Sequence, residues 1–355
     1  MAEEDTLEDE SLAKEAAQEE PVDVNVEEPQ EDLAEQVEEQ IEEATTFFSN
    51  LAEGMDERQL GQLASELITD YRKDKESRGD WEKAYTSGLD LLGFKYNDEG
   101  QPFKGASGVT HPLLAESVTQ FQAQAYKELL PSDGPVRTHI LGGITPAKEQ
   151  QASRVKDFMN YQIMEVMEEY TPEFDQMLFY LPLAGSAFKK IYFDELLGRA
   201  VSKFVPAEDL VVPYYVTDLK ESERITHVLK MSENDILKKQ KSGFYRDVPI
   251  TPSQQEDSDI QDKYNQIEGV DQQDGTDYQF NILEMHVDLD LEFESEEKNV
   301  KIPYIVTIDE GSQEILSIYR NFKQDDTRFK RNEYFVHYKF LPGLGFYGFG
   351  LIHWF

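Results

Sequence analysis

The sequence predicts an α+β fold in which an N-terminal helical region is followed by a β-rich region. Apolar residues recur at helical spacing over much of residues 51–250, whereas they alternate with polar residues in residues 278–355. Residues 1–50 differ from both regions, because they carry nineteen acidic residues and the single base Lys14. The chain is therefore expected to comprise an acidic tail, a mainly helical region and a β-rich region.

The first fifty residues predict a disordered acidic tail. Their only aromatic residues are Phe47 and Phe48, and so little apolar surface cannot offset the entropy lost on ordering. The remainder is acidic as well, and the whole chain has a net charge of −38. This charge argues against a protein that reads DNA sequence through a basic face, but it is compatible with a conduit through which DNA slides.

Helices are predicted in four places between the tail and residue 170. The second is expected to end at Gly93, the third begins near Pro112 and ends near Pro131, and the fourth begins after Pro146. Their apolar stripes are expected to form the core or subunit contacts. The four stripes are Leu60, Leu63, Leu67 and Tyr71; Trp81, Tyr85, Leu89 and Leu92; Leu114, Val118, Phe121, Ala125 and Leu129; and Val155, Phe158, Met159, Ile163, Val166, Met167 and Tyr170.

A further helix carrying Phe174 and Leu181 is predicted to end at Gly185, and a β-hairpin is predicted near residues 187–205. Pro206 and Pro213 then fix the backbone, so the chain must turn or lie on a sheet edge there. An ion pair between Asp218 and Arg224 is expected to hold the following turn.

Residues 251–277 are mostly Gln, Asp, Ser and Gly and predict a long flexible surface loop. A short helix precedes this loop at Ser232–Gly243. The β-rich region follows, with a hairpin turn at Asp309-Glu310-Gly311. Its predicted strands are Phe280–Phe293, Ile302–Ile308, Ile315–Tyr319 and Tyr334–Phe340.

The absence of cysteine excludes disulfides, thiolate metal sites and cysteine nucleophiles. No run of residues reaches the roughly 20 apolar residues of a membrane helix, and the N-terminus does not resemble a signal peptide. We therefore expect no contact with a membrane.

Two motifs point to chemistry only weakly. Glu284, His286, Asp288 and Asp290 alternate with apolar residues, so in a strand they share one face and could hold a divalent metal. The same alternation is typical of a strand with one solvated face. The segment Gly343–Gly348 spells a dinucleotide-binding fingerprint, but no helix or acidic residue can follow in the seven remaining residues. The better interpretation is a turn whose aromatic residues pack on a neighbour. The sequence thus predicts no catalytic site, no cofactor and no metal.

Three segments, in the same order, resemble the portal proteins of tailed bacteriophages, especially those of short-tailed phages. The first is Pro112–Glu116 with Glu128–Pro131 and Gly134–Val136, and the third is Tyr334–Tyr338 with Pro342–Gly350. The second runs from Leu183–Ala187 through Phe204 to His227. The structural motif residues of the second and third segments are Pro206, Asp209, Pro213, Tyr214, Asp218, Arg224, His227, Pro342, Gly343, Gly345, Phe346, Tyr347 and Gly348.

The resemblance implies a portal-like wing architecture and a structural subunit rather than an enzyme. It implies a ring of copies, expected to be a dodecamer, at the capsid portal vertex of the virion, assembled in the host cytoplasm. DNA would pass through this ring during packaging and ejection without sequence-specific binding. Terminase, capsid and scaffolding proteins, and tail adaptor proteins would be the partners. Because the family continues beyond the glycine-rich segment, the chain is expected to be a truncated N-terminal part.

Two alternatives remain open. The first is a metal-dependent enzyme that uses the acidic and histidine residues of the strand at 284–290. The second is a monomeric scaffold or adaptor protein that works through its acidic tail.

Overall fold

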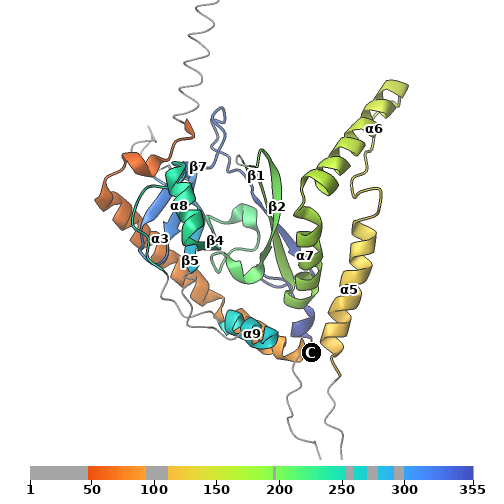
Figure 1. Cartoon of the computed structure of the whole chain (residues 1–355), viewed down its shortest axis with the longest axis horizontal. Helices are drawn as coiled ribbons and strands as arrows, with labels where there is room; N and C mark the ends of the chain where they lie inside the picture. Colours follow the sequence, from red (N-terminus) through yellow and green to blue (C-terminus); the bar gives the residue numbers. More distant parts are fainter. Residues whose placement is uncertain are drawn as a thin grey trace, which may run out of the picture. The chain divides into compact units, whose positions relative to one another are not determined.

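The computed structural model describes residues 47–92, 111–194, 197–252, 259–269, 279–291 and 300–354. It confirms the α+β class, with helices first and antiparallel sheets after them (Figure 1). The helices are α3 (Glu57–Ser77), α4 (Gly79–Leu89), α5 (Leu113–Leu129), α6 (Pro146–Tyr161), α7 (Tyr170–Ala184), α8 (Glu233–Lys241) and α9 (Asp259–Glu268). The strands are β1 (Ser186–Asp194), β2 (Arg199–Pro206), β3 (Leu210–Val211), β4 (Arg224–Ser232), β5 (Gln279–Leu289), β6 (Ile302–Asp309), β7 (Ile315–Arg320) and β8 (Phe335–Lys339).

The strands form two antiparallel sheets that both draw on the two halves of the chain. The three-stranded sheet has the order β2-β1-β8, and the five-stranded sheet has the order β3-β4-β5-β6-β7. In the first sheet, β8 from the predicted β-rich region pairs with the predicted hairpin; in the second, β4 pairs with β5 over nine residues. The predicted helical and β-rich regions therefore share both sheets.

The three-stranded sheet is buried on both faces over half of its length. On one face, Ala187 and Phe204 pack against Phe174, Met177 and Leu178 of α7. On the other, Phe188 and Val205 join a core with residues of the five-stranded sheet and its connections, including Leu210, Ile225 and Phe335. The resulting order is helix, small sheet, large sheet.

The fourth predicted helix is divided in two. It continues from α6 through a π-helix at Gln162–Val166, after which Met167 leaves the helical conformation and α7 begins at Tyr170. Pro172 explains the new start, because proline has no N–H to donate within a continuing helix but is tolerated in a first turn.

The predicted loop at residues 251–277 is wrong for residues 259–268, which form α9. Polar composition hid this helix, whose buried residue is Ile260. Tyr264 also anchors α9, because its hydroxyl donates to Glu208 Oε1 at 2.9 Å and lies 2.7 Å from the Tyr85 hydroxyl. One buried apolar residue and the hydrogen bonds of Tyr264 thus stabilise a helix whose sequence resembles a linker.

The predicted tail of residues 1–50 extends too far. Asn50 is buried, donates to the carbonyl of Leu316 and accepts from the N–H groups of Ala52 and Ile318. Residues 1–46 and the predicted helix end at Gly93 lie outside the described residues. Among the described helices, none is long and apolar enough to cross a membrane.

Two glycine-containing segments cross where α7 ends. Gly185 has φ of 85° and accepts a hydrogen bond from the Phe340 N–H, while the Gly348 N–H donates to Ser186 Oγ at 2.7 Å. A Cβ on Gly348 would collide with the Gly185 carbonyl, and one on Gly350 with the Leu183 carbonyl. Glycine is therefore required for close backbone approach, which explains the fingerprint-like segment without a nucleotide.

We predict that Gly348→Ala lowers the free energy of unfolding by about 1–3 kcal/mol, because the added methyl overpacks the crossing. Gly345→Ala is the matched control, since a Cβ there meets nothing within 4 Å, and it should change stability by less than about 0.5 kcal/mol. Urea unfolding followed by tryptophan fluorescence measures both. Equal stability of the two variants would contradict the crossing.

Candidate functional site

Arg78, between α3 and α4, gathers two of the family-like segments around one buried guanidinium. It donates to the carbonyl oxygens of Ala207, Glu208 and Leu210, and to the Tyr347 hydroxyl at 3.1 Å. Glu82 completes the shell at 2.8 Å. The connection between the two sheets and the glycine-rich segment are thus tied to the helical region through one side chain that the sequence interpretation missed.

Two acidic residues beside Arg78 lie in surroundings that disfavour their ionised forms. Burial raises the pKa of Glu208 to about 7 and that of the motif residue Asp209 to about 6. Tyr264 of α9 donates to one oxygen of Glu208, while the other, Oε2, is buried without a hydrogen-bond partner. The hydrogen bond from Tyr264 ties Glu208, and with it the chain connection, to α9.

Of the three aromatic residues that follow Gly345, Phe346 and Tyr347 pack within the chain, contrary to the expected contact with a neighbour, whereas Phe349 is 39% exposed. Phe346 is buried against Phe188, at 5.8 Å between ring centroids, and Tyr347 stacks on Trp81 at 4.5 Å. Gly343 must be glycine because a Cβ would meet the Tyr347 carbonyl, whereas Pro342 and Gly345 are exposed.

The predicted Asp218–Arg224 ion pair is wrong. Arg224 instead contacts both oxygens of Asp74, at 2.8 and 3.1 Å, and Asp70 at 2.9 Å, which fastens β4 to α3. Asp218 accepts from the N–H of Lys220 and caps a short 3-10 helix. The carboxylate satisfies a local donor, while the guanidinium faces a helix distant in sequence.

The other second-segment motif residues differ in environment. Pro206 ends β2 opposite Ala187, and Pro213 is buried directly after β3. Tyr214 follows with 82% of its surface exposed. Only Tyr214 among these three therefore offers a side chain to an outside partner.

A buried polar group joins the two sheets. Lys190 of β1 lies 2.6 Å from both carboxylate oxygens of Glu284 on β5, and Glu284 Oε1 lies 2.9 Å from His286 Nε2. Asn321 Nδ2 lies 3.4 Å from His286 Nδ1, so His286 donates to Glu284 and accepts from Asn321. Lys190 and the hydrogen bond from His286 hold the pKa of Glu284 well below its usual value despite desolvation.

The expected solvated face of the 284–290 strand is therefore wrong for its first half. His286 is buried and Glu284 nearly so, because β1 and β8 cover them, whereas Asp290 is exposed. Among the described residues, no group of three or more histidine and acidic side chains is arranged to hold a metal ion. The four residues are split between a core ion pair and the surface.

The motif residue His227 lies beside this group without a hydrogen-bond partner on Nδ1. Burial lowers its pKa to about 3, so the imidazole is neutral and packs edge-on against Phe335 at 5.5 Å. Burial likewise lowers the pKa of His337 to about 3 and depresses that of His286. These histidines are core residues.

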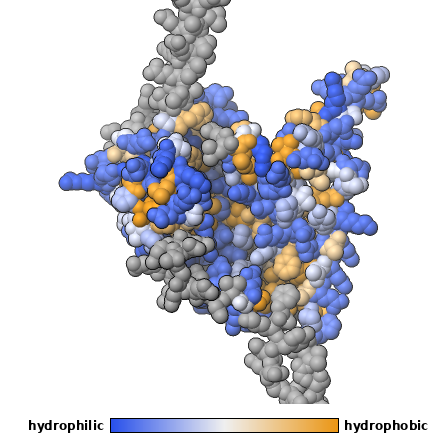
Figure 2. Space-filling view, in the orientation of Figure 1, coloured by the Kyte–Doolittle hydropathy of each residue, from blue (hydrophilic) through white to orange (hydrophobic). Residues whose placement is uncertain are grey.

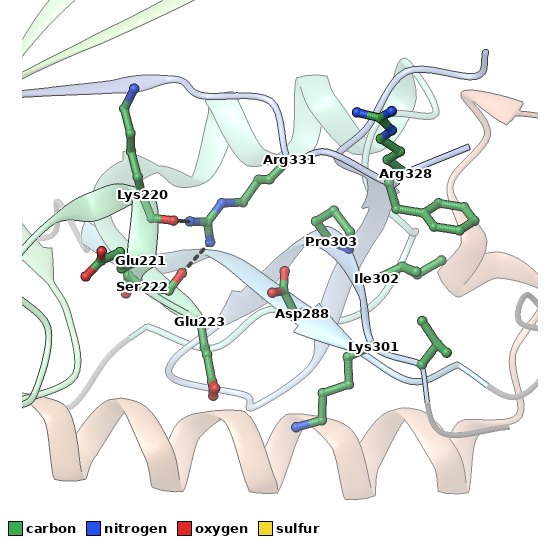
Figure 3. A pocket seen from close by; sticks show the side chains of 12 residues that line it. Lys220, Glu221, Ser222, Glu223, Asp288, Lys301, Ile302, Pro303, Arg328 and Arg331 are labelled. Atoms are coloured by element: carbon green, nitrogen blue, oxygen red, sulfur yellow. Dashed lines mark hydrogen bonds between the residues drawn. The ribbon is translucent and has the colours of Figure 1, made fainter. Parts of the chain in front are cut away.

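A cavity of about 280 Å³ opens beside the ends of β5 and β6. Its lining carries both signs of charge, including Asp288, Lys301 and Arg331 (Figure 3). Arg331 donates to the carbonyl of Ser222 at 2.6 Å and holds the loop before β4. The described residues that line the cavity include no histidine. The contacts of Arg331 show that this charged group holds the neighbouring loop in place.

The most conspicuous surface feature is α6. Within the described chain this helix contributes no buried residue, and Val155, Phe158 and Met159 are 47%, 60% and 41% exposed. Their spacing places them on one helix face. Asn160 fixes the base of the helix by accepting from the Val136 N–H and donating to the Val136 carbonyl. The fourth predicted stripe was expected to form either core or subunit contacts. For its residues in α6, the described structure excludes a place in the core.

Comparison with known proteins adds no family assignment. No model of a known protein family matches the chain, and a search of curated proteins finds no match either.

We predict that Lys190→Met lowers the free energy of unfolding by about 3–5 kcal/mol, because it leaves the Glu284 carboxylate buried without its cation. Glu284→Met alone should destabilise by a similar amount. The double variant should recover most of the loss, since an apolar pair of similar volume replaces a buried ion pair with little cost. A double-mutant cycle by urea unfolding measures the coupling, and additive losses would contradict it.

Two substitutions should change the pH dependence of stability in opposite directions. The lowered pKa of His227 gives stability that is present above about pH 6.5 and is lost as the pH falls toward 3. Relative to His227→Leu, the parent should therefore lose about 1.4 kcal/mol of unfolding free energy per pH unit below pH 6.5.

The raised pKa of Glu208 stabilises the fold at low pH, and this stabilisation is lost as the pH rises toward 7. The stability of Glu208→Gln should therefore rise relative to that of the parent between pH 4.5 and 7.

Denaturant unfolding between pH 4 and 8 measures both curves. His111→Leu is the control, because the His111 imidazole is 72% exposed. A His227→Leu curve parallel to that of the parent would show that His227 does not stay neutral in the folded protein.

Proposed function

We propose that this chain is a structural subunit of a bacteriophage portal ring. In this role, copies of the chain surround a channel for DNA packaging and ejection at the capsid vertex of the virion, after assembly in the host cytoplasm. Terminase, capsid, scaffolding and tail adaptor proteins are the proposed partners. The proposed dodecameric state is based on the resemblance to portal proteins. The role requires no bond chemistry from the chain itself.

The unpartnered apolar face of α6 is the observation that carries this proposal. Against the described part of the chain, α6 has no buried residue, so its exposed Val155, Phe158 and Met159 need an explanation other than packing there. A contact with another subunit supplies one. The ordered family-like segments supply the second support, because Leu183–Ala187 and Gly348–Gly350 meet in one crossing.

The acidic composition fits the proposed channel. With a net charge of −38, the chain has little capacity for tight phosphate binding, which would hinder DNA that must move. Self-association then has to come from local surfaces that overcome the repulsion between copies.

We predict that the purified chain forms closed rings, with a subunit number that native mass spectrometry measures and a shape that negative-stain microscopy records. Val155→Glu combined with Phe158→Glu should convert these rings to monomers, because two carboxylates would be buried at the contact. Leu237→Glu on α8, at a leucine that is 41% exposed, is the matched control and should leave the rings intact. A parent chain that stays monomeric across protein concentrations and salt would overturn the proposal.

A further inference from the structure

The three-stranded sheet has an open half that none of the helices in the described residues covers. Side chains two residues apart on a strand share a face, and directly opposed residues share it too. Lys189, Ile191 and Phe193 of β1 therefore lie on one face together with Val336 of β8, which is paired with Lys189. Ile191, Phe193 and Val336 are 45%, 64% and 42% exposed.

The same face is covered at its other end by α7. Lys189 Nζ lies 4.0 Å from the ring centre of Tyr170 and 5.0 Å from that of Phe174. The helix layer stops there, because the chain turns away into the π-helix and α6 (Figure 1). Figure 2 shows a notch between α6 and the hairpin, with apolar side chains at its sides.

We infer that α6 of a second copy of this chain packs on the open half of the sheet and extends the helix layer that α7 begins. The inference rests on the proposed ring and names its contact surfaces. The apolar face of α6 suits an uncovered apolar sheet face, since helices pack on sheets through such stripes. The two surfaces are of similar exposure, and the described residues cover neither of them.

Local charge favours the same pairing. Residues 134–161 carry four bases, Arg137, Lys148, Arg154 and Lys156, and only two acids, Glu149 and Asp157. Residues 165–175, which lead into α7 beside the open half, carry five acids and no base. Arg199 of the hairpin pairs with Glu169 at 2.7 Å, which places this acidic segment beside the hairpin. In the inferred contact, the excess of bases in residues 134–161 of one copy thus lies near the acids of residues 165–175 in the other. This attraction is local, because the two copies as a whole repel each other.

The contact is heterologous, because α6 of one copy meets β1 and β8 of another. Each copy therefore offers both surfaces, and the contact can repeat from copy to copy until the ring closes. An isologous contact, with α6 on α6, would instead produce a dimer.

Disulfide cross-linking tests the contact directly, because the chain contains no cysteine. Phe158→Cys is prepared with natural isotopes and Phe193→Cys with heavy isotopes, and the two are mixed under assembling conditions and oxidised. The expected product is a covalent dimer of one light and one heavy chain, and a chain with both substitutions should give a ladder of covalent oligomers. A short bismaleimide linker repeats the test with looser geometry. Phe158→Cys mixed with Tyr214→Cys is the control and should give no dimer.

The outcomes separate this inference from the proposed function. Rings that form but give no light–heavy dimer with either reagent would overturn the inference and leave the ring standing. Dimers from Phe158→Cys alone would also overturn it, because they place α6 against α6. Rings that persist in the Val155→Glu, Phe158→Glu chain would assign α6 to a different partner and likewise overturn it. Absence of any assembly before oxidation would remove the proposed function itself.

Discussion

The buried pair of Lys190 and Glu284 is the constraint on which the packing of the two sheets depends. Here an ion pair connects β1 to β5 across the core. The Lys190 and Glu284 side chains are 13% and 16% exposed. Such a pair adds little net stability, because desolvation of both ions offsets their attraction. Its effect is on register instead: a sliding sheet would leave an unpaired charge in the interior. His286, Asn321 and Phe335 complete an environment that suits only one arrangement.

That arrangement explains why segments distant in the sequence depend on each other. β8 pairs with β1 in the three-stranded sheet, and β4 pairs with β5 in the five-stranded sheet. Arg78 then binds the connection between the sheets and Tyr347 at once. The glycine crossing sits on the same seam, with Gly348 against Gly185. Residues that resemble portal motifs are therefore largely those that let the two halves of the chain meet.

The sequence predicted the elements well and their partners poorly. Periodicity located α3, α4, α5 and the strands β1, β2, β5, β6, β7 and β8, because each pattern is local. It did not locate β3 or β4, although β4 is the strand that pairs with β5. It could not assign Arg224 to Asp74 rather than Asp218, since that choice depends on which helix lies beside β4. Polar composition concealed α9, whose helix depends on Tyr264 and Ile260. One signal was available for the buried network: Lys189 and Lys190 interrupt an apolar strand, and both prove to be shielded, one by aromatic rings and one by Glu284.

The proposed contact between copies depends on the surface that the folded chain leaves exposed. Copies with a net charge of −38 repel one another, so a contact must be short-ranged, apolar and locally relieved of negative charge. Residues 134–161 meet these conditions, because they combine an excess of bases with the exposed face of α6. The open half of the three-stranded sheet meets them from the other side, through Ile191, Phe193 and Val336. Because α7 already uses the covered half of that face, a second helix in the same layer continues a packing mode that the fold has established. In the proposed ring, the acidity elsewhere would disfavour approaches that bring like charges together without an apolar contact.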